Sequence, residues 1–365
     1  MSPGAPGSPP GAPVEVVIAV HTPRRPVGRA VASVLDGNAA HTRTTVVCHN
    51  VPAAEIAAVI SPRHRDRVRY LEHRDPRPSA SGPFNAGMAA ADGEYLAIMG
   101  SDDWLQPGAV ASWLDLADRT GAETVITRLA LGRPGRPVRT PPTRPWLRGL
   151  ADPVKDRLSY RSAPLGLVSR AARDRLGAAL VEGMTVGGDV PYVTRLWFGT
   201  RVAVDRRGPA YVIGTGAEDR VTYTPRPIRE EFAFVRHLLD QDWFRAYPAG
   251  ARRAVCTKLT RIHLFGAVHN RPDPAFWTAA ERTALADAAE RLLVAAPGFA
   301  EVLSLADRDL LDTVQDLGVP AAAMIHAAQA RRRHGRPRTL VPRDLRMSLA
   351  AEAPLRLMAA SALTR

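Results

Sequence analysis

Short apolar runs alternate with amphipathic segments over the first third of the chain. Five runs rich in apolar residues, too short for buried helices, predict strands over residues 14–20, 44–48, 68–71, 95–99 and 124–129. Helical spacing of apolar residues between these runs predicts helices over residues 26–35, 53–60, 83–91 and 107–119. Strands that alternate with helices pair in parallel, so the pattern predicts an α/β sheet whose strands end along one ligand-binding edge.

The segments that flank this pattern are less regular. Residues 1–13 are rich in Pro, Gly and Ser and predict a flexible leader. Residues 131–175 are rich in Pro and Arg and predict an irregular cationic insertion. Strand-like runs return at residues 201–204 and 210–213. We therefore expect the α/β domain to span residues 14–229.

The last third of the chain has helical periodicity. The composition changes near residues 225–227, which indicates a domain boundary. We expect a helical domain over residues 230–330, whose amphipathic pattern is most simply a core. Residues 331–365 begin with a cluster of arginines and predict a mobile basic tail.

Composition narrows the class of protein. The chain has 365 residues, 45% apolar and 23% charged, which suits one large or two ordinary domains and not a disordered protein. Its two cysteines exclude a four-cysteine zinc site and a disulfide framework. Apolar runs of about 18 residues, as a membrane-spanning helix requires, are absent, and residues 1–13 lack the apolar core of a secretory signal. We expect a cytoplasmic protein.

The strongest chemical signal is Asp102-Asp103, directly after the predicted strand over residues 95–99. Two adjacent carboxylates repel each other and need a compensating cation or hydrogen-bond donor. Mg²⁺ and Mn²⁺ bind through one or two carboxylates plus the phosphates of a substrate. A solvated turn with an N-cap aspartate explains the pair about equally well, but its place at the end of a buried strand favours a site.

A second candidate is Asp189, which follows two glycines and precedes a helical apolar pattern. A carboxylate on the same edge as Asp103 could act as a general base. An aspartate after Gly-Gly is also an ordinary helix N-cap, and the residues alone favour that simpler interpretation.

Three segments together resemble the family 2 glycosyltransferases of the GT-A fold. The resemblance runs from about residue 14 to residue 227. Its most specific block, FNAGMAAADGEYLAIMGSDDWLQPGAV, carries the family's pattern Asn-x-Gly, Ala-x-Gly-Glu-Tyr, Asp-Asp and Pro-Gly, here Asn85, Gly87, Ala91, Gly93, Glu94, Tyr95, Asp102, Asp103, Pro107 and Gly108. The other two segments are VEVVIAVHTPRRPVGRAVASVL and GGDVPYVTRLWFGTRVAVDRRGPAYVI.

The resemblance implies a GT-A fold, with a Rossmann-like mixed sheet flanked by helices, followed by the C-terminal helical region. It implies inverting transfer of a sugar from a nucleotide diphosphate sugar, usually UDP-linked, with Mg²⁺ or Mn²⁺. Asp103 would bind the metal, Asp102 would contact the ribose or the metal and its waters, and Asp189 would be the catalytic base. Residues 131–185 would form the acceptor side.

Further residues are candidates to bind the donor. They are His21, Thr22, His49, Asn50, Ser81, Asn85 and Arg220. The histidine and asparagine side chains could hydrogen-bond a base, and Arg220 could pair with phosphate oxygens. For Arg220 a surface ion pair is the better interpretation, and His21 and Thr22 also suit a polar loop. Trp104 is expected to be a packing residue.

The sequence departs from the family pattern in three places. Gly100 stands where the first acidic residue of Asp-x-Asp is usual, Gly188 stands before the catalytic aspartate where Glu is usual, and the loop after the second strand reads Cys48-His49-Asn50 instead of carrying Asp. These departures leave open the metal dependence and the nucleotide. They also motivate one alternative, a catalytically silent interaction protein.

The formal charge of +13 motivates another alternative, a nucleic-acid binder. Its arginines cluster in the insertion and the tail without interleaved aromatic residues, so we expect no nucleic-acid partner. An anionic polymer or a lipid-linked glycan of the cell envelope suits the charge better as acceptor. Peripheral contact of residues 331–365 with the inner membrane face and homo-oligomerisation through the helical region are further hypotheses.

Overall fold

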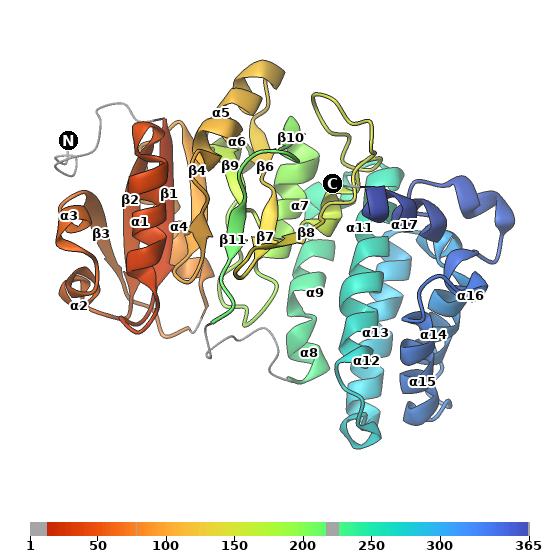
Figure 1. Ribbon diagram of the computed structural model, residues 1–365. Helices are drawn as coiled ribbons and strands as arrows, with labels where there is room; N and C mark the ends of the chain where they lie inside the picture. Colours follow the sequence, from red (N-terminus) through yellow and green to blue (C-terminus); the bar gives the residue numbers. More distant parts are fainter. Residues whose placement is uncertain (1–12, 78, 217–225, 364–365) are drawn as a thin grey trace.

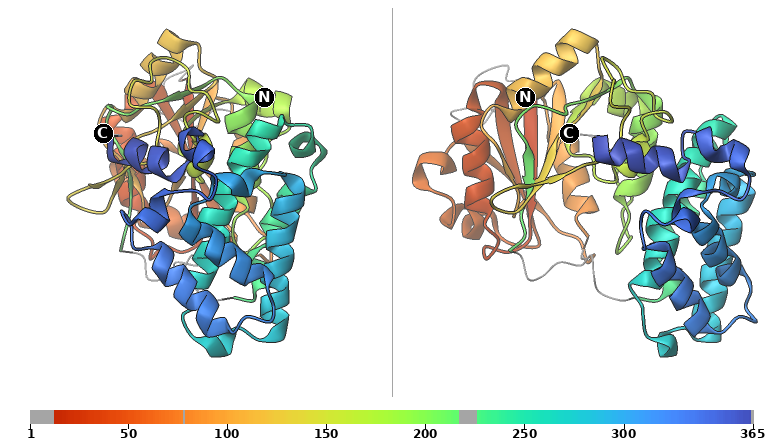
Figure 2. Two further views of the ribbon diagram at one scale, coloured as in Figure 1. Left: turned by 90° about the vertical axis from the view of Figure 1, so that its right-hand side faces the viewer. Right: turned by 45° about the vertical axis from the view of Figure 1, so that its right-hand side comes forward.

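The computed structural model describes residues 13–77, 79–216 and 226–363 (Figure 1). An α/β domain with a large twisted sheet packs beside a bundle of helices, as Figure 1 and the right view of Figure 2 show. The predicted fold class, a mixed α/β sheet followed by a helical region, is confirmed.

The main sheet has the strand order β10-β6-β9-β4-β1-β2-β3. Its strands are β1 (Val14–Val20), β2 (Thr42–His49), β3 (Val68–His73), β4 (Tyr95–Gly100), β6 (Thr124–Ile126), β9 (Gly166–Ser169) and β10 (Val202–Val204). The neighbours β4, β1, β2 and β3 are all parallel, as predicted. Their carboxyl ends therefore lie along one edge of the sheet.

Strand β9 is the part of the main sheet that the sequence did not predict. It lies between β4 and β6 and runs antiparallel to both. The region expected to be an irregular insertion therefore supplies an internal strand of the sheet. Its four residues are too few to show a period in the sequence.

Helices cover both faces of the main sheet. On one face, Val16, Ile18 and Val20 pack with α1 (Val27–Gly37) and α5 (Ala109–Thr120). On the other, Val17 packs with α4 (Ser81–Ala90) and α7 (Asp189–Gly199). The remaining helices here are η1 (Ala39–His41), α2 (Ala53–Ala58), α3 (Pro62–Arg65), η2 (Leu158–Tyr160) and α6 (Arg170–Leu176). Burial on both faces explains why the strands read as continuous apolar runs.

A second, smaller sheet lies against the carboxyl edge. Its order is β5-β11-β7-β8, with β5 (Trp104–Leu105), β11 (Tyr211–Ile213), β7 (Leu129–Leu131) and β8 (Arg136–Val138). Because β5 directly follows Asp102-Asp103 and pairs with β11, the sheet brings residues 211–214 to this aspartate pair.

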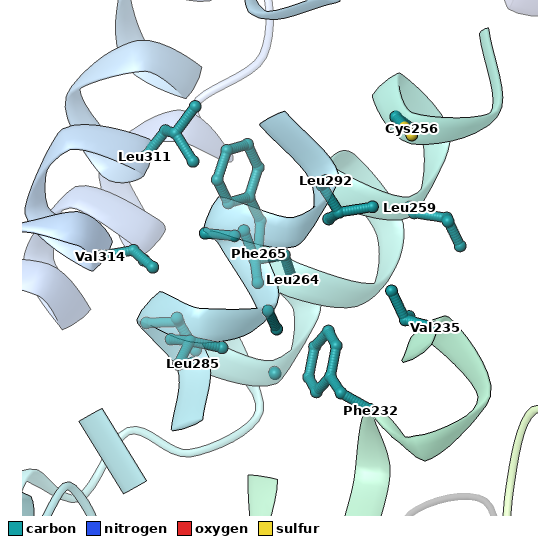
Figure 3. Close-up of a cluster of buried hydrophobic side chains, with 14 of the residues drawn as sticks. Phe232, Val235, Cys256, Leu259, Leu264, Phe265, Leu285, Leu292, Leu311 and Val314 are labelled. Carbon is teal, nitrogen blue, oxygen red and sulfur yellow. The ribbon is translucent and has the colours of Figure 1, made fainter. Parts of the chain in front are cut away.

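The helical region begins with α8 at Ile228, two residues from the predicted boundary. Its elements are α8 (Ile228–Glu231), α9 (Ala233–Leu239), α10 (Asp242–Arg245), α11 (Ala249–Lys258), η4 (Leu259–Leu264), α12 (Phe265–His269), η5 (Pro274–Phe276), α13 (Ala279–Ala295), η6 (Phe299–Val302), α14 (Leu305–Gln315) and α15 (Ala321–Arg331). Its apolar faces meet in one core (Figure 3). Val190 of α7 also belongs to this core, so the two regions are packed together.

The C-terminal segment is folded, which corrects the expectation of a mobile tail. It contains α16 (Pro337–Leu340), η7 (Leu345–Leu349) and α17 (Pro354–Leu363). Glu352 and Ala353 are buried, and Arg157 Nε donates to the carbonyl oxygen of Ala351 at 3.0 Å. Several tail arginines pair with acidic residues of α14, such as Arg338 with Asp309 at 2.5 Å. These local charge pairs explain how an arginine-rich segment can pack. Among the described residues, no helix is both long and apolar enough to cross a membrane.

Candidate active site

A cavity of about 730 Å³ opens at the carboxyl ends of β1, β2 and β4. The ends of these strands and the loops that follow them contribute His21, His49, Asn50, Asp102 and Asp103 to its walls. Five of the residues singled out from the sequence therefore meet at one place. The parallel strands explain this convergence, since their carboxyl ends share an edge.

Of the two adjacent aspartates, Asp102 forms an ion pair with an arginine of the cavity wall. Its Oδ2 lies 3.1 Å from Nη1 of Arg25, which also lines the cavity. Arg29 donates to the carbonyl oxygen of Asp102, and its guanidinium stacks on the ring of Trp104 at 4.3 Å. The repulsion expected between the adjacent aspartates is thus offset by two arginines. Trp104 packs between Arg29 and Arg133, in agreement with the predicted packing role.

Asp103 is held by the small sheet. Tyr211 donates its hydroxyl to Oδ2 at 2.5 Å, and the backbone N–H of Gly214 donates to Oδ1 at 2.8 Å. Burial, followed by the charge of Asp103, raises the pKa of Tyr211 well above its usual value, so the phenol remains a donor. The same hydroxyl accepts from the backbone N–H of Gly100 at 3.1 Å. Asp103 is therefore fixed from two sides.

Gly100 approaches both carboxylates closely. A Cβ built at this position would lie 2.7 Å from Oδ2 of Asp103 and 3.2 Å from Oδ1 of Asp102. The acidic residue that the family pattern usually has here would press a third carboxylate against the other two. Gly100, which has no side chain, therefore leaves room for the two carboxylates.

His49 and Asn50 form the wall below β2. His49 Nε2 lies 3.3 Å from Oδ1 of Asp75, and Asn50 Nδ2 donates to the Asp75 carbonyl oxygen at 2.7 Å. His73 Nε2 lies 2.8 Å from Oδ2 of Asp75. Burial raises the pKa of Asp75, but hydrogen bonds from the backbone N–H of Arg77 and from the two histidines outweigh it and lower the pKa overall. Asp75 therefore orders both polar residues.

Two predicted donor-binding residues support the cavity from outside. Asn85 donates to the Leu180 carbonyl oxygen at 2.9 Å and accepts from the Leu180 N–H at 3.0 Å. Its amide is used to hold the loop before α7, which corrects its predicted place in the pocket. Ser81 is buried beside Gly188, while Ser79 and Ala80 line the cavity instead.

Two predicted donor contacts remain, Thr22 and Arg220, and of the described residues Thr22 is not among the cavity walls. Thr22 accepts from the backbone N–H of Arg25 at 3.2 Å, which forms a turn after β1. Direct contact of Thr22 with the donor stays a prediction. Arg220, with its neighbour Asp219, lies outside the described residues.

Asp189 is the first residue of α7, next to the cavity. The loop before it contributes Thr185 to the cavity wall. A Cβ at Gly188 would lie 2.9 Å from Oγ of Ser81 and 2.5 Å from the Val181 carbonyl oxygen, so the glutamate usual in the family has no room there. Asp189 thus begins a helix that starts beside the α4 entry. Its side chain is partly buried and does not itself line the described cavity.

The helical region adds a cation near Asp189. Lys258, at the end of α11, is 2% exposed, and its Nζ lies 3.0 Å from Nε2 of His263. Burial raises the pKa of Asp189, and the charge of Lys258 opposes this rise. Burial lowers the pKa of Lys258 to about 8, and burial and the Lys258 charge lower the pKa of His263 well below its usual value. His263 is therefore neutral beside a charged lysine near neutral pH.

The sequence did not single out Arg25, Asp75, Tyr211 or Lys258. Arg25 follows the first strand in an arginine-rich loop, and Asp75 follows the third strand, so position after a strand could have suggested both. Tyr211 binds Asp103 and Lys258 influences Asp189 from segments far away in the sequence, and nothing local in the sequence marks them.

Known proteins resemble a large part of the α/β domain. Residues 15–177 match the model of the glycosyl transferase family 2. The succinoglycan biosynthesis protein ExoO of Rhizobium meliloti (strain 1021) is 29% identical over 119 residues, a match that covers 32% of this chain and 33% of ExoO. The match thus spans about a third of that curated relative.

Solved structures resemble nearly the whole chain. S. aureus TarS 1–349 in complex with UDP-GlcNAc has a TM-score of 0.70 at 13% identity, covering 87% of this chain and 91% of TarS 1–349. The complex of TarS 1–349 with UDP has a TM-score of 0.64 at 14% identity, covering 88% of this chain and 92% of that one. At these identities the likeness shows the fold, which is GT-A with a helical extension. The family match itself covers residues 15–177, and this part of the chain is similar to the family 2 glycosyltransferases.

Proposed function

We propose that the chain moves a sugar from a nucleotide diphosphate sugar, UDP-linked, to an acceptor hydroxyl with inversion. The observation that carries this proposal is the convergence of Asp102, Asp103, His49 and Asn50 in one cavity, to which Thr185 of the loop before Asp189 also contributes. His49 and Asn50 can hydrogen-bond a base, and Arg25 faces the region where a diphosphate would lie. The binding of UDP-GlcNAc by TarS, which shares the fold, supports a UDP-linked donor.

The proposed reaction needs no covalent enzyme intermediate. The acceptor oxygen forms a bond to the anomeric carbon while the bond from that carbon to the diphosphate oxygen breaks. The electron pair of the broken bond leaves on the diphosphate, near Arg25. Asp189 takes the proton of the attacking hydroxyl. Attack opposite to the leaving group inverts the anomeric centre.

A divalent cation, Mg²⁺ or Mn²⁺, fits the aspartate side of the cavity. Such ions bind through one or two carboxylates and complete their shell with phosphates and water. Asp102 and Asp103 both line the cavity, but both carboxylate oxygens of Asp103 already accept hydrogen bonds, from Tyr211 and Gly214. We therefore favour Asp102 as the principal protein ligand, with Asp103 as a second ligand fixed in place by Tyr211. When bound, the cation would neutralise charge on the departing diphosphate.

The donor can be identified by a thermal-shift screen. The full chain is heated with a panel of nucleotide sugars, with and without Mg²⁺ or Mn²⁺, because a ligand of the folded state raises its melting temperature. The variant Asp189→Asn should keep the shift and lose transfer by about 10²- to 10⁴-fold. Asp102→Asn should lose the shift. A wild-type chain that no nucleotide sugar stabilises and that releases no nucleotide would contradict the proposal.

Contact with a membrane carrying a lipid-linked acceptor is supported by the C-terminal segment. Leu345 is 69% and Leu349 80% exposed, with Arg346 between them, and Leu355 of α17 is 54% exposed. Exposed leucines beside arginine suit the surface of an anionic bilayer. Vesicles containing anionic lipid should therefore retain the full chain. The double variant Leu349→Ser, Leu355→Ser should bind them less, and equal retention of both would contradict this contact.

A further inference from the structure

A second cavity, of about 400 Å³, lies at the carboxyl ends of β6 and β10. Three arginines line it, from the start of β7, the end of β8 and the loop after β10: Arg128, Arg139 and Arg206. The donor cavity does not include these residues. The two cavities are linked through β7, because Leu129 lines the second cavity and Leu131 pairs with Ile213, which lines the first.

The three arginines of the second cavity have no carboxylate partner within 4.0 Å among the described residues. Arg206 donates to the carbonyl oxygens of Arg144, Pro145 and Leu147, and Arg139 donates weakly to that of Ala362 at 3.4 Å. Asp205 is the acidic residue of the lining, and its carboxylate accepts from Ser112 and from two backbone N–H groups. With three arginines and one aspartate, the lining therefore carries a net positive charge.

A fourth arginine lies buried behind the wall. Arg161 is 2% exposed, and its Nη2 donates to the carbonyl oxygens of Thr127 and Thr140, two residues that line the cavity. Its Nε and Nη1 have no hydrogen-bond partner in the described part of the chain. Burial lowers the pKa of Arg161, and no neighbouring carboxylate raises it. A buried guanidinium without a counter-ion is costly unless an anion approaches it.

We propose that this cavity binds an oxyanion, a phosphate or carboxylate group carried by the acceptor. The proposal rests on the proposed transferase function, since it assigns the acceptor of that reaction to an anionic class. Arginine forks match the oxygens of both groups, and the buried charge of Arg161 acts through a low-dielectric wall. Strand β7 spans three residues, about 10 Å at the usual rise per residue. A bound anion would thus hold the acceptor chain within reach of the donor cavity.

The binding of small anions to the full chain tests this site. Inorganic phosphate and glucuronate are titrated calorimetrically at low ionic strength in the Arg25→Gln background, which weakens phosphate binding in the donor cavity. At least one of the two anions should bind. The double variant Arg128→Gln, Arg139→Gln should bind it with at least tenfold lower affinity. The matched control is Arg136→Gln, an exposed arginine of β8 outside the cavity, which should bind like its parent. Which anion binds distinguishes a phosphate from a carboxylate acceptor.

Two results would overturn the site: neither anion binds, or Arg128→Gln, Arg139→Gln binds like Arg136→Gln. Arg161→Met is a second probe. It should lower the affinity for the anion although Arg161 does not contact the anion, and circular dichroism should show that the variant is folded. Titration of UDP into the Arg128→Gln, Arg139→Gln variant with native Arg25 separates the two proposals. If the variant loses anion binding and keeps its UDP affinity, the transferase proposal and the anion-site proposal are both supported. If the wild-type chain binds the anion but no nucleotide sugar, only the transferase proposal is contradicted.

Discussion

At the scale of single residues, the adjacent aspartates have different surroundings. Asp102 faces Arg25 in the cavity, and Asp103 is fixed by the Tyr211 hydroxyl and the Gly214 backbone. A bound cation could replace Arg25 as the partner of Asp102. Asp103 instead fixes the turn that carries Asp102. Two neighbours with the same chemistry thus take different roles because different elements approach them.

The role of Tyr211 leads to a prediction. Tyr211→Phe removes the donor to Asp103 and the acceptor of the Gly100 N–H, both buried, and should lower the free energy of unfolding by about 1–3 kcal/mol. Donor affinity should fall with it. The control Tyr192→Phe removes a hydroxyl that contacts only the Met88 sulfur at 3.6 Å, and should cost less. Chemical denaturation and nucleotide titration measure both effects, and equal stability of the two variants would contradict the role.

At the scale of elements, the α-helix α11 continues into a π-helical segment, and this change places Lys258 beside His263. Segment η4 is a π-helical turn, in which residues five apart are neighbours. In an α-helix, Lys258 and His263 would point about 140° apart. The π-turn follows Lys258 directly, and the two side chains meet at 3.0 Å.

The charge of Lys258 predicts a pH effect. In its proposed role as the base, Asp189 must be ionised to accept a proton, and burial raises its pKa while Lys258 lowers it. Lys258→Met removes the opposing charge, so the pKa of Asp189 rises and activity is lost at a higher pH on acidification. The pH profile of kcat/KM should shift its acid limb upward. Lys155→Met, at the other lysine, which is exposed, is the control. A uniform loss of rate with an unshifted limb would assign Lys258 a structural role only.

The start of α7 leads to a prediction of its own. Gly188→Ala places a Cβ 2.5 Å from the Val181 carbonyl oxygen, so the loop must shift and displace Asp189. We expect kcat to fall at least tenfold with donor affinity nearly unchanged. Gly250→Ala, in α11 with nothing near its Cβ, should keep activity and gain up to about 1 kcal/mol in stability. Full activity of Gly188→Ala would show that the loop adapts.

At the scale of the whole molecule, a buried charged cluster joins the tail to the rest. Arg261 donates to the carbonyl oxygen of Glu352 at 2.9 Å and to Tyr160 at 3.2 Å, and Asp307 lies 3.4 Å from its Nε. Burial opposes the charge of Arg261, but Tyr160, Asp307 and Glu352 outweigh it and raise its pKa. Insertion, helical region and tail therefore share one network.

Removal of residues 343–365 tests this network. The deletion takes away Glu352 and the Ala351 carbonyl, and leaves the guanidinium groups of Arg157 and Arg261 with fewer partners. Breaking one side of a buried charged cluster costs about 3–5 kcal/mol. Thermal unfolding should therefore show a clearly lower melting temperature than for the full chain. A mobile tail would leave the melting temperature unchanged.

The sequence by itself determined the α/β pattern, because a strand buried on both faces must be continuously apolar and a helix on its face must be amphipathic. It also indicated Asp102, Asp103, His49 and Asn50, since residues directly after parallel strands share an edge whatever the rest of the chain does. For Asp189 the residues alone favoured a helix N-cap over a general base, and the family resemblance is what implied the catalytic role.

Only the tertiary structure decided which partners those residues have. Strand β9 is too short to show a period, and Tyr211 and Lys258 reach the site from distant segments. The tail packs because its arginines find carboxylates on α14, a pairing that composition cannot reveal. Contacts between segments far apart in the chain depend on the packing of whole elements, and local sequence carries no record of that packing.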